Sequence, residues 1–192
     1  VMAFPQSTPY TTFLMAARRN TLDRYQKIMA PQARLYNGSK YLVPEVSFEQ
    51  HPYFASEDWI TGSVLYDGEY FDDVPLMYNL RYDALITEHY PSGHAIQLVR
   101  EKLEYFSVAG HHFERISNES VSNSLPGTGF YDVLYGGDTK VVAWRRKFLR
   151  EEIEAMKVNT TYDERNRYFI LRNGVFFPVK NKASVLKLMD DR

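Results

Sequence analysis

Short runs of aromatic and apolar residues, most of them followed within a few residues by a turn, recur along this chain. Four turns carry a residue pair ending in glycine between aromatic or apolar residues: Asn37-Gly38, Asp67-Gly68, Gly136-Gly137 and Asn173-Gly174. Such pairs tolerate positive φ at both central positions of a turn and are typical of type I′ hairpins. The pattern therefore predicts a mainly β protein built from antiparallel hairpins.

Runs rich in aromatic and β-branched residues predict about a dozen strands. In chain order the expected strands span residues 33–36, 40–46, 62–66, 69–71, 74–80, 84–89, 94–100, 103–108, 112–116, 130–135, 140–148, 167–172 and 175–179. Residues 149–158 fit either a helix or a polar excursion. Because most strands are followed within a few residues by the next one, the sheet is expected to be a meander. It can close into a barrel or fold into a two-sheet sandwich.

Two segments have helical periodicity. Between Thr11 and Met29 the apolar residues recur at helical spacing, which predicts an amphipathic helix that ends before Pro31. Its apolar stripe is expected to pack on the sheet, with a membrane surface as the alternative. A short helix is expected over residues 183–189. The chain is accordingly divided into an N-terminal segment with its helix, residues 1–31, and a single β-rich domain, residues 32–192.

Composition narrows the classes of function. The 192 residues include 23 basic and 24 acidic ones, for a formal charge of −1, so no basic field is present to attract nucleic acid. The absence of cysteine excludes disulfides and a cysteine nucleophile. No stretch has the length of a transmembrane helix. The opening residues 1–7 fit either the end of a cleaved signal peptide or a remnant of an expression vector.

The polar residues suggest no catalytic or metal centre. His111-His112 are neighbours on an expected strand and point to opposite faces, so they do not readily chelate one ion. His89 and His94 flank a turn, but no third ligand is indicated. Asp72-Asp73 fits a solvated turn, and the chain has no Gly-x-Ser-x-Gly motif. We therefore expect no catalytic residue, no metal and no cofactor.

Two stretches are candidates for a binding surface. Tyr53, Phe54 and Trp59 could form an aromatic platform, because flat rings with polar edges suit sugars and protein interfaces, although the same rings could pack in the core. Asn118 and Leu125 belong to a loop, residues 117–129, that is rich in Ser, Asn and Gly. Loops of this length between hairpins are often binding elements or disordered connectors.

A series of turn and core motifs extends over about residues 30 to 190. The motifs lie at residues 35–41, 51–54, 59, 62–68, 74–76, 129–137, 167–169 and 177–182, and include Leu-Tyr-Asn-Gly-Ser-Lys-Tyr, His-Pro-Tyr-Phe and Phe-Tyr-Asp-Val-Leu-Tyr-Gly-Gly. This series resembles a family of uncharacterised exported proteins of Bacteroidota. The resemblance implies a signal peptide and a location in the periplasm, in the outer membrane or at the cell surface. It assigns no catalytic residue.

These observations favour a non-enzymatic envelope protein whose β scaffold binds another envelope protein, for example as an accessory subunit of an outer-membrane or surface assembly. One alternative is a β-barrel that binds a small ligand or a glycan, which requires an unfilled interior lined by aromatic rings. Another is a hydrolase. A broad apolar patch, an open apolar cavity and a deep polar pocket would distinguish the three.

Overall fold

The computed structural model describes residues 13–21, 24, 34–42, 50–89, 92–117, 125–137, 139–154, 157–172 and 175–190. Its strands are β1 (Ser39–Lys40), β2 (Ile60–Tyr66), β3 (Glu69–Asn79), β4 (Ala84–His89), β5 (His94–Gln97), β6 (Leu103–Val108), β7 (His111–Ile116), β8 (Gly129–Tyr135), β9 (Lys140–Glu154), β10 (Lys157–Arg172) and β11 (Val175–Val179). Short 3₁₀ helices span η2 (Arg34–Tyr36) and η3 (Arg100–Lys102), and the helix α2 spans Lys182–Asp190.

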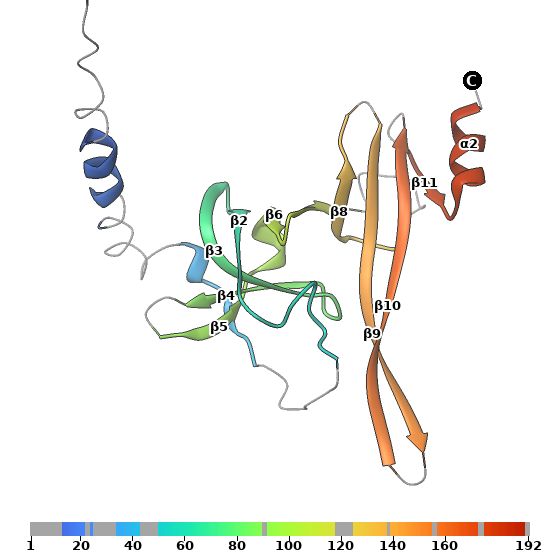
Figure 1. Ribbon diagram of the computed structural model, residues 1–192, viewed down its shortest axis with the longest axis horizontal. Helices are drawn as coiled ribbons and strands as arrows, with labels where there is room; N and C mark the ends of the chain where they lie inside the picture. The colour runs from blue at the N-terminus through green and yellow to red at the C-terminus, as the bar shows by residue number, and fades with distance from the viewer. Residues whose placement is uncertain are drawn as a thin grey trace, which may run out of the picture.

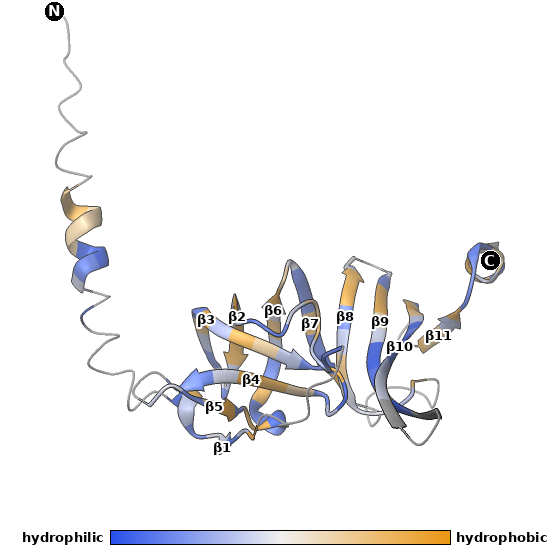
Figure 2. Ribbon diagram, turned by 60° about the horizontal axis from the view of Figure 1, so that its bottom comes forward, coloured by the Kyte–Doolittle hydropathy of each residue, from blue (hydrophilic) through white to orange (hydrophobic). Residues whose placement is uncertain are grey.

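The strands form one 11-stranded sheet in the order β1-β5-β4-β3-β2-β6-β7-β8-β9-β10-β11 (Figures 1 and 2). Each pair of neighbours is antiparallel. The prediction of a mainly β, antiparallel meander is confirmed. Among the described strands β1 and β11 lie at the two ends of the order, so the sheet is open rather than closed into a barrel.

A bulge in β3 turns the first half of the sheet over on itself. Gly62 pairs with Val74 and Val64 pairs with Phe71, so Asp72 and Asp73 together oppose a single residue of β2. An extra residue in one strand bends that strand and increases its twist. Beyond the bulge, β4 crosses the direction of β2, β6 and β7 (Figure 2). The turn predicted at Asp72-Asp73 is therefore wrong: one strand of 11 residues runs through it.

The space between the crossed halves is filled by one apolar cluster. It contains residues of β2, β3, β4, β6, β7 and β8, among them Val64, Tyr66, Leu76, Tyr78, Leu85, Phe106, Phe113 and Phe130. The rings of Tyr78, Phe106, Phe113 and Phe130 form its centre. The ring centroids are 4.9 Å apart for Phe106 and Phe113 and 5.2 Å apart for Phe106 and Phe130. A second cluster covers part of the β8–β11 region and contains Leu125, Tyr131, Val142, Phe169 and Phe176.

Two tight turns have a left-handed backbone, one expected from the sequence and one not. Asp67 and Gly68 have φ of 54° and 76° and join β2 to β3, which confirms the hairpin predicted there. Ala109 and Gly110, with φ of 52° and 76°, join β6 to β7 in the same way. Alanine at the first position hid this second turn type from the sequence pattern, because a Cβ disfavours positive φ.

The other glycine pairs behave differently. The hairpin predicted at Asn37-Gly38 is wrong, because residues 34–36 form η2 and β1 pairs with β5. Gly38 serves close approach, since a Cβ there would lie 2.1 Å from the Gln97 carbonyl oxygen. Gly136 and Gly137 join β8 to β9 without positive φ. The pair at residues 173–174 lies outside the described residues.

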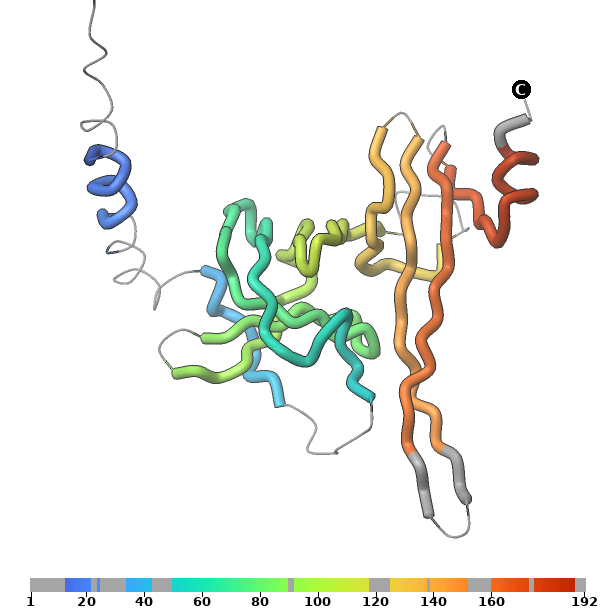
Figure 3. Tube along the Cα trace, viewed as in Figure 1, coloured from blue at the N-terminus to red at the C-terminus, as the bar shows by residue number. Residues whose placement is uncertain are grey.

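The longest hairpin is β9–β10, with strands of 15 and 16 residues (Figure 3). Its ladder is continuous from Lys140 paired with Leu171 to Glu154 paired with Lys157. A helix or polar excursion over residues 149–158 is therefore wrong wherever the chain is described, since those residues continue the two strands. The far half of this hairpin extends beyond the neighbouring strands.

The helices differ in their packing. Residues 13–21 are helical, but Phe13, Leu14 and Met15 are 68%, 47% and 73% exposed, so this part does not pack on the sheet as predicted (Figure 1). The rest of that predicted helix is not described, apart from residue 24. The C-terminal helix is confirmed as α2, and Arg172 Nη1 donates to the Leu188 carbonyl oxygen at 2.5 Å. No helix in the described ranges is long and apolar enough to cross a membrane.

Candidate binding site

The edge of β10 is open over part of its length. β11 pairs only with Tyr168 to Arg172 of β10, whereas β9 pairs with β10 from residue 157 to residue 171. On the side away from β9, residues 157–167 of β10 are paired with no described strand. Unpaired strand backbone is a template for another strand.

The direction of the backbone groups along this edge can be inferred from one contact. The Tyr162 N–H donates to Gln50 Oε1 at 3.1 Å, so it points away from β9. In an antiparallel ladder every second residue directs both its N–H and its C=O to the same side. The N–H and C=O groups of Glu164 and Asn166 therefore point to the open side as well. Two residues offer four groups to an added strand.

The outermost edges of the sheet offer less to a partner strand. β1 has only two residues. β11 has five, and one of them is Pro178, which has no N–H to donate. Short edge strands and edge prolines are common protection against strand pairing. The open part of β10 has neither, although charged side chains flank it.

A pocket of about 630 Å³ lies where β11 ends and the open edge begins. Its lining comes from β10, β11 and the residues just before β8, namely Leu125, Pro126, Asn166, Arg167, Tyr168, Phe169, Pro178, Val179 and Lys180. Most of these side chains are apolar. The only charged ones are Arg167 and Lys180, and both are cationic.

Arginines stack on aromatic rings along one face of the β9–β10 hairpin. Arg167 lies over the Trp144 ring, 5.4 Å from its centroid, and Arg165 lies over Phe148 at 5.0 Å. Phe148 is 41% exposed, and the Arg165 side chain is 61% exposed. Stacking on a ring leaves the N–H groups of a guanidinium available to other partners. The open edge of β10 thus adjoins a cationic, aromatic face.

The middle of the hairpin is held by residues 50–54. Lys147 Nζ donates to the carbonyl oxygens of His51 at 3.1 Å and Tyr53 at 2.9 Å. Burial lowers the pKa of Lys147, and two carbonyl acceptors satisfy its ammonium group. Tyr162 is buried beside this contact, at 7% exposure. Residues 50–54 therefore support the hairpin at Tyr162, in the middle of the open edge.

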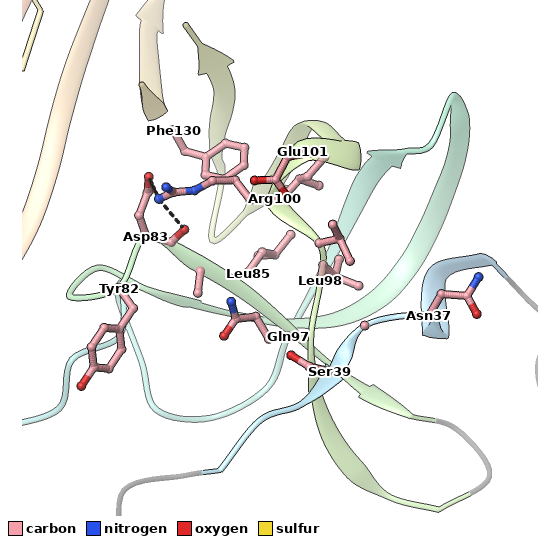
Figure 4. Close-up of a pocket in the computed structure, with 14 residues that line it drawn as sticks. Asn37, Ser39, Tyr82, Asp83, Leu85, Gln97, Leu98, Arg100, Glu101 and Phe130 are labelled. Atoms are coloured by element: carbon pink, nitrogen blue, oxygen red, sulfur yellow. Dashed lines mark hydrogen bonds and ion pairs between the residues drawn. The ribbon is translucent and has the colours of Figure 1, made fainter. Parts of the chain in front are cut away.

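A buried carboxylate links the β3–β4 turn to β9. Asp83 is 4% exposed and is paired with Arg146, at 2.8 Å, and with Arg100. The Tyr78 hydroxyl donates to the same carboxylate at 2.5 Å. Figure 4 shows Asp83 and Arg100 directed toward each other. This network holds the folded-over half of the sheet against the hairpin.

Asp83 and Arg100 also line a second pocket of about 610 Å³, between the β4–β5 region and residues 37–39 (Figure 4). Gln97, Glu101 and Ser39 add polar groups, while Leu85, Leu98 and Phe130 add apolar ones. The guanidinium group of Arg100 and the carboxylate of Asp83 are already paired with each other. Glu101 is the one charged residue of the lining outside this pair, and a single carboxylate gives the pocket little charge with which to select a ligand.

A second buried carboxylate lies in β8. Asp132 is 1% exposed, and its Oδ2 accepts from Arg145 Nε at 2.7 Å and contacts His111 Nδ1 at 2.9 Å. Phe54 packs edge-on against the His111 ring, with centroids 5.0 Å apart. Asp132 Oδ1 has no hydrogen-bond partner among the described protein atoms. No group of three potential metal ligands gathers in the described part of the chain.

The residues expected at a binding surface are not brought together. Tyr53 and Leu125 are 5% and 6% exposed and belong to apolar clusters, so most of each side chain is not available to a partner. Leu125 also lines the pocket beside β10. Phe54 is partly buried against Phe113. Trp59 is 37% exposed. Asn118 lies outside the described residues.

Sequence reasoning missed the open edge and the stacked arginines. The arginines at 165 and 167 alternate with polar residues, a pattern that was visible but that is also common on solvated strands. Comparison with models of protein families, with curated proteins and with solved structures found no match for this chain.

Burial also affects the tyrosines and gives a prediction for alkaline pH. Burial raises the pKa of Tyr131 to about 12 from 10.0, and raises the pKa of Tyr53 and Tyr78 as well. Above pH 10 the unfolded chain loses phenolic protons that the folded protein keeps, so stability must fall as the pH rises. The lowered pKa of Lys147 has the opposite effect on stability. Between that lowered pKa and the ordinary pKa of lysine, the unfolded chain holds a proton that the folded protein has lost, so this group raises stability as the pH rises.

We therefore expect the urea midpoint to fall steeply between pH 10 and about 12. Absorbance at 295 nm should show these tyrosines ionising together with unfolding. Complete ionisation of all the tyrosines near pH 10 in a protein that is still folded would contradict the burial of their hydroxyl groups.

Proposed function

We propose that this protein is a non-enzymatic β scaffold that binds another protein by accepting an extended segment at the open edge of β10. The observation that carries the proposal is the mismatch between β10 and β11: β10 has 16 residues and β11 has five. An added strand would continue the line of β11 past its end at Val179. Main-chain hydrogen bonds would supply affinity, and the adjacent pocket would supply specificity.

The length of the hairpin supports the proposal. A two-stranded β ribbon on its own is marginally stable in water. The far half of β9–β10 has only itself for pairing within the described strands, although residues 50–54 support its middle. A third strand along β10 would complete the sheet there.

The interior of the fold favours this function over a ligand-binding barrel. That alternative requires an unfilled interior lined by aromatic rings. Tyr66, Tyr78, Phe106 and Phe113 lie between the crossed halves and are each no more than 1% exposed. These rings fill the interior with their own contacts, so the aromatic residues of this chain build a scaffold. Assignment to the cell envelope, as the family resemblance implies, remains part of the proposal.

Proline at position 166 tests the proposal. Asn166 directs its N–H to the open side, so Asn166→Pro should remove a donor from the edge while leaving the ladder to β9 intact. Asn166→Thr is the matched control, because it changes the side chain but keeps the N–H.

The probe is a displayed library of random nine-residue peptides selected against the wild-type protein. Selected peptides should bind the wild type and Asn166→Thr and should lose at least about tenfold in affinity for Asn166→Pro. Circular dichroism would establish that the variants are folded. Peptides that bind the proline variant as tightly as the wild type would contradict strand addition at this edge.

A further inference from the structure

The arginines beside the open edge identify the chemistry of the segment that it binds. This inference rests on the proposed function and concerns the partner's side chains. Arg165 and Arg167 are two residues apart on β10, so they lie on one face of the strand, about 7 Å from each other. Both stack on rings of β9 and are thereby held in place.

On their own face of β10, the charges around these arginines are not balanced. The Glu164 side chain lies on the opposite face of the strand, where it accepts from Asn166 Nδ2 at 3.0 Å. Asp163 pairs with Arg165 at 3.0 Å, but its side chain is 43% exposed, so this pair is open to competition from another carboxylate. Among the described residues no ion pair involves Arg167. Lys180 adds a third cation at the pocket, whose lining contains no carboxylate. The local excess of positive charge favours an anionic partner.

The register of an added strand places the partner's residues. A residue opposite Asn166 would form hydrogen bonds through the open backbone groups of β10. Its two neighbours along the added strand would then lie opposite Arg165 and Arg167 and on their face of the sheet. Directly opposed side chains have Cβ atoms about 5 Å apart, within reach of a carboxylate–guanidinium pair.

We propose that the occupant of this edge is an extended segment of another protein with acidic residues at alternate positions, which pair with Arg165 and Arg167. Backbone complementarity selects a strand, because Glu164 and Asn166 present N–H and C=O groups in strand geometry. Charge complementarity selects acidic side chains. The apolar part of the pocket accommodates a residue next to the acidic ones.

Three blocked nine-residue peptides test this inference by calorimetry. Each alternates valine with one polar residue, which is Glu in the first, Gln in the second and Lys in the third. The Glu peptide should bind at least about tenfold more tightly than the Gln peptide, and more weakly as NaCl is raised; the Lys peptide should not bind. The double variant Arg165→Glu, Arg167→Glu should reverse the preference to Lys.

Arg81→Glu is the matched control, because Arg81 also stacks on a ring, 5.0 Å from the Tyr82 centroid, but lies in the β3–β4 turn. It should keep the preference for the Glu peptide. Equal binding of the Glu and Gln peptides would overturn the acidic partner and leave strand addition intact. Failure of library peptides to distinguish Asn166→Pro would instead overturn the proposed function.

Two other occupants of the edge would also contradict the inference. A dimer in sedimentation that Asn166→Pro disperses would identify a second copy of this chain as the occupant. Binding of phosphatidylglycerol vesicles that the double arginine variant abolishes, with no preference among the peptides, would identify an anionic lipid surface.

Discussion

Asp83→Asn is expected to lower the free energy of unfolding by about 3–5 kcal/mol, the range for breaking a buried ion pair from one side. The Asp83 carboxylate is 4% exposed and neutralises Arg146, whose side chain is only 11% exposed. An amide has the same shape but no charge, so two guanidinium groups would lose their common partner. Urea denaturation at pH 7 measures the loss.

Asp67→Asn is the matched control for this variant. Asp67 pairs with Lys102 at 3.1 Å, but both side chains are about 40% exposed, and such surface pairs contribute about 0–1 kcal/mol. Asparagine also tolerates the positive φ at this turn. Equal losses in the two variants would mean that Asp83 does not fasten the β3–β4 turn to β9.

Phe113→Ala is expected to cost about 3–5 kcal/mol. The ring is 1% exposed, stacks on Phe106 and touches Tyr78, with both pairs of centroids 4.9 Å apart. Removal of this ring leaves a cavity between the two crossed halves of the sheet, and neither half can move alone to fill it. Thermal and urea denaturation should both report the loss.

Phe148→Ala is the comparison for that variant. Phe148 is 41% exposed, so its truncation should cost less than about 1 kcal/mol. A loss at Phe113 no larger than that at Phe148 would show that the crossed halves of the sheet do not share one core.

Strands whose apolar residues form a short run between turn residues were predictable from the sequence. The ranges 84–89, 103–108 and 175–179 agree with β4, β6 and β11. In each of these strands the hydrophobic residues and the turn residues that bound them lie within a few positions of one another, so the local sequence is enough to predict the strand. The C-terminal helix was predictable for the same reason.

Elements that depend on distant partners were not predictable. The bulge at Asp72-Asp73 contains two residues typical of turns, and only the pairing with β2 makes them part of a strand. Residues 149–154 are rich in charge and have little strand propensity, yet the ladder to β10 carries them as strand. Strand formation is governed by cross-strand context more than by intrinsic preference.

The candidate site was hidden for a similar reason. An open edge results from the difference in length between β10 and β11, and no single segment contains that information. Arg165 and Arg167 were visible in the sequence, but their stacking on Phe148 and Trp144 depends on the register of β9. Tyr53 was a plausible surface aromatic until the fold placed it in a cluster with Met77 and Ile86.

Residue-resolved amide hydrogen exchange tests strand addition at β10 most directly. The measurement compares the protein alone with the protein bound to a library-selected peptide. Binding should slow exchange of the Glu164 and Asn166 amides by at least about tenfold, since those N–H groups would enter new hydrogen bonds. The Arg165 amide, which faces β9, should change little. Saturated binding that leaves the Glu164 and Asn166 amides exchanging at their original rates would contradict strand addition at this edge.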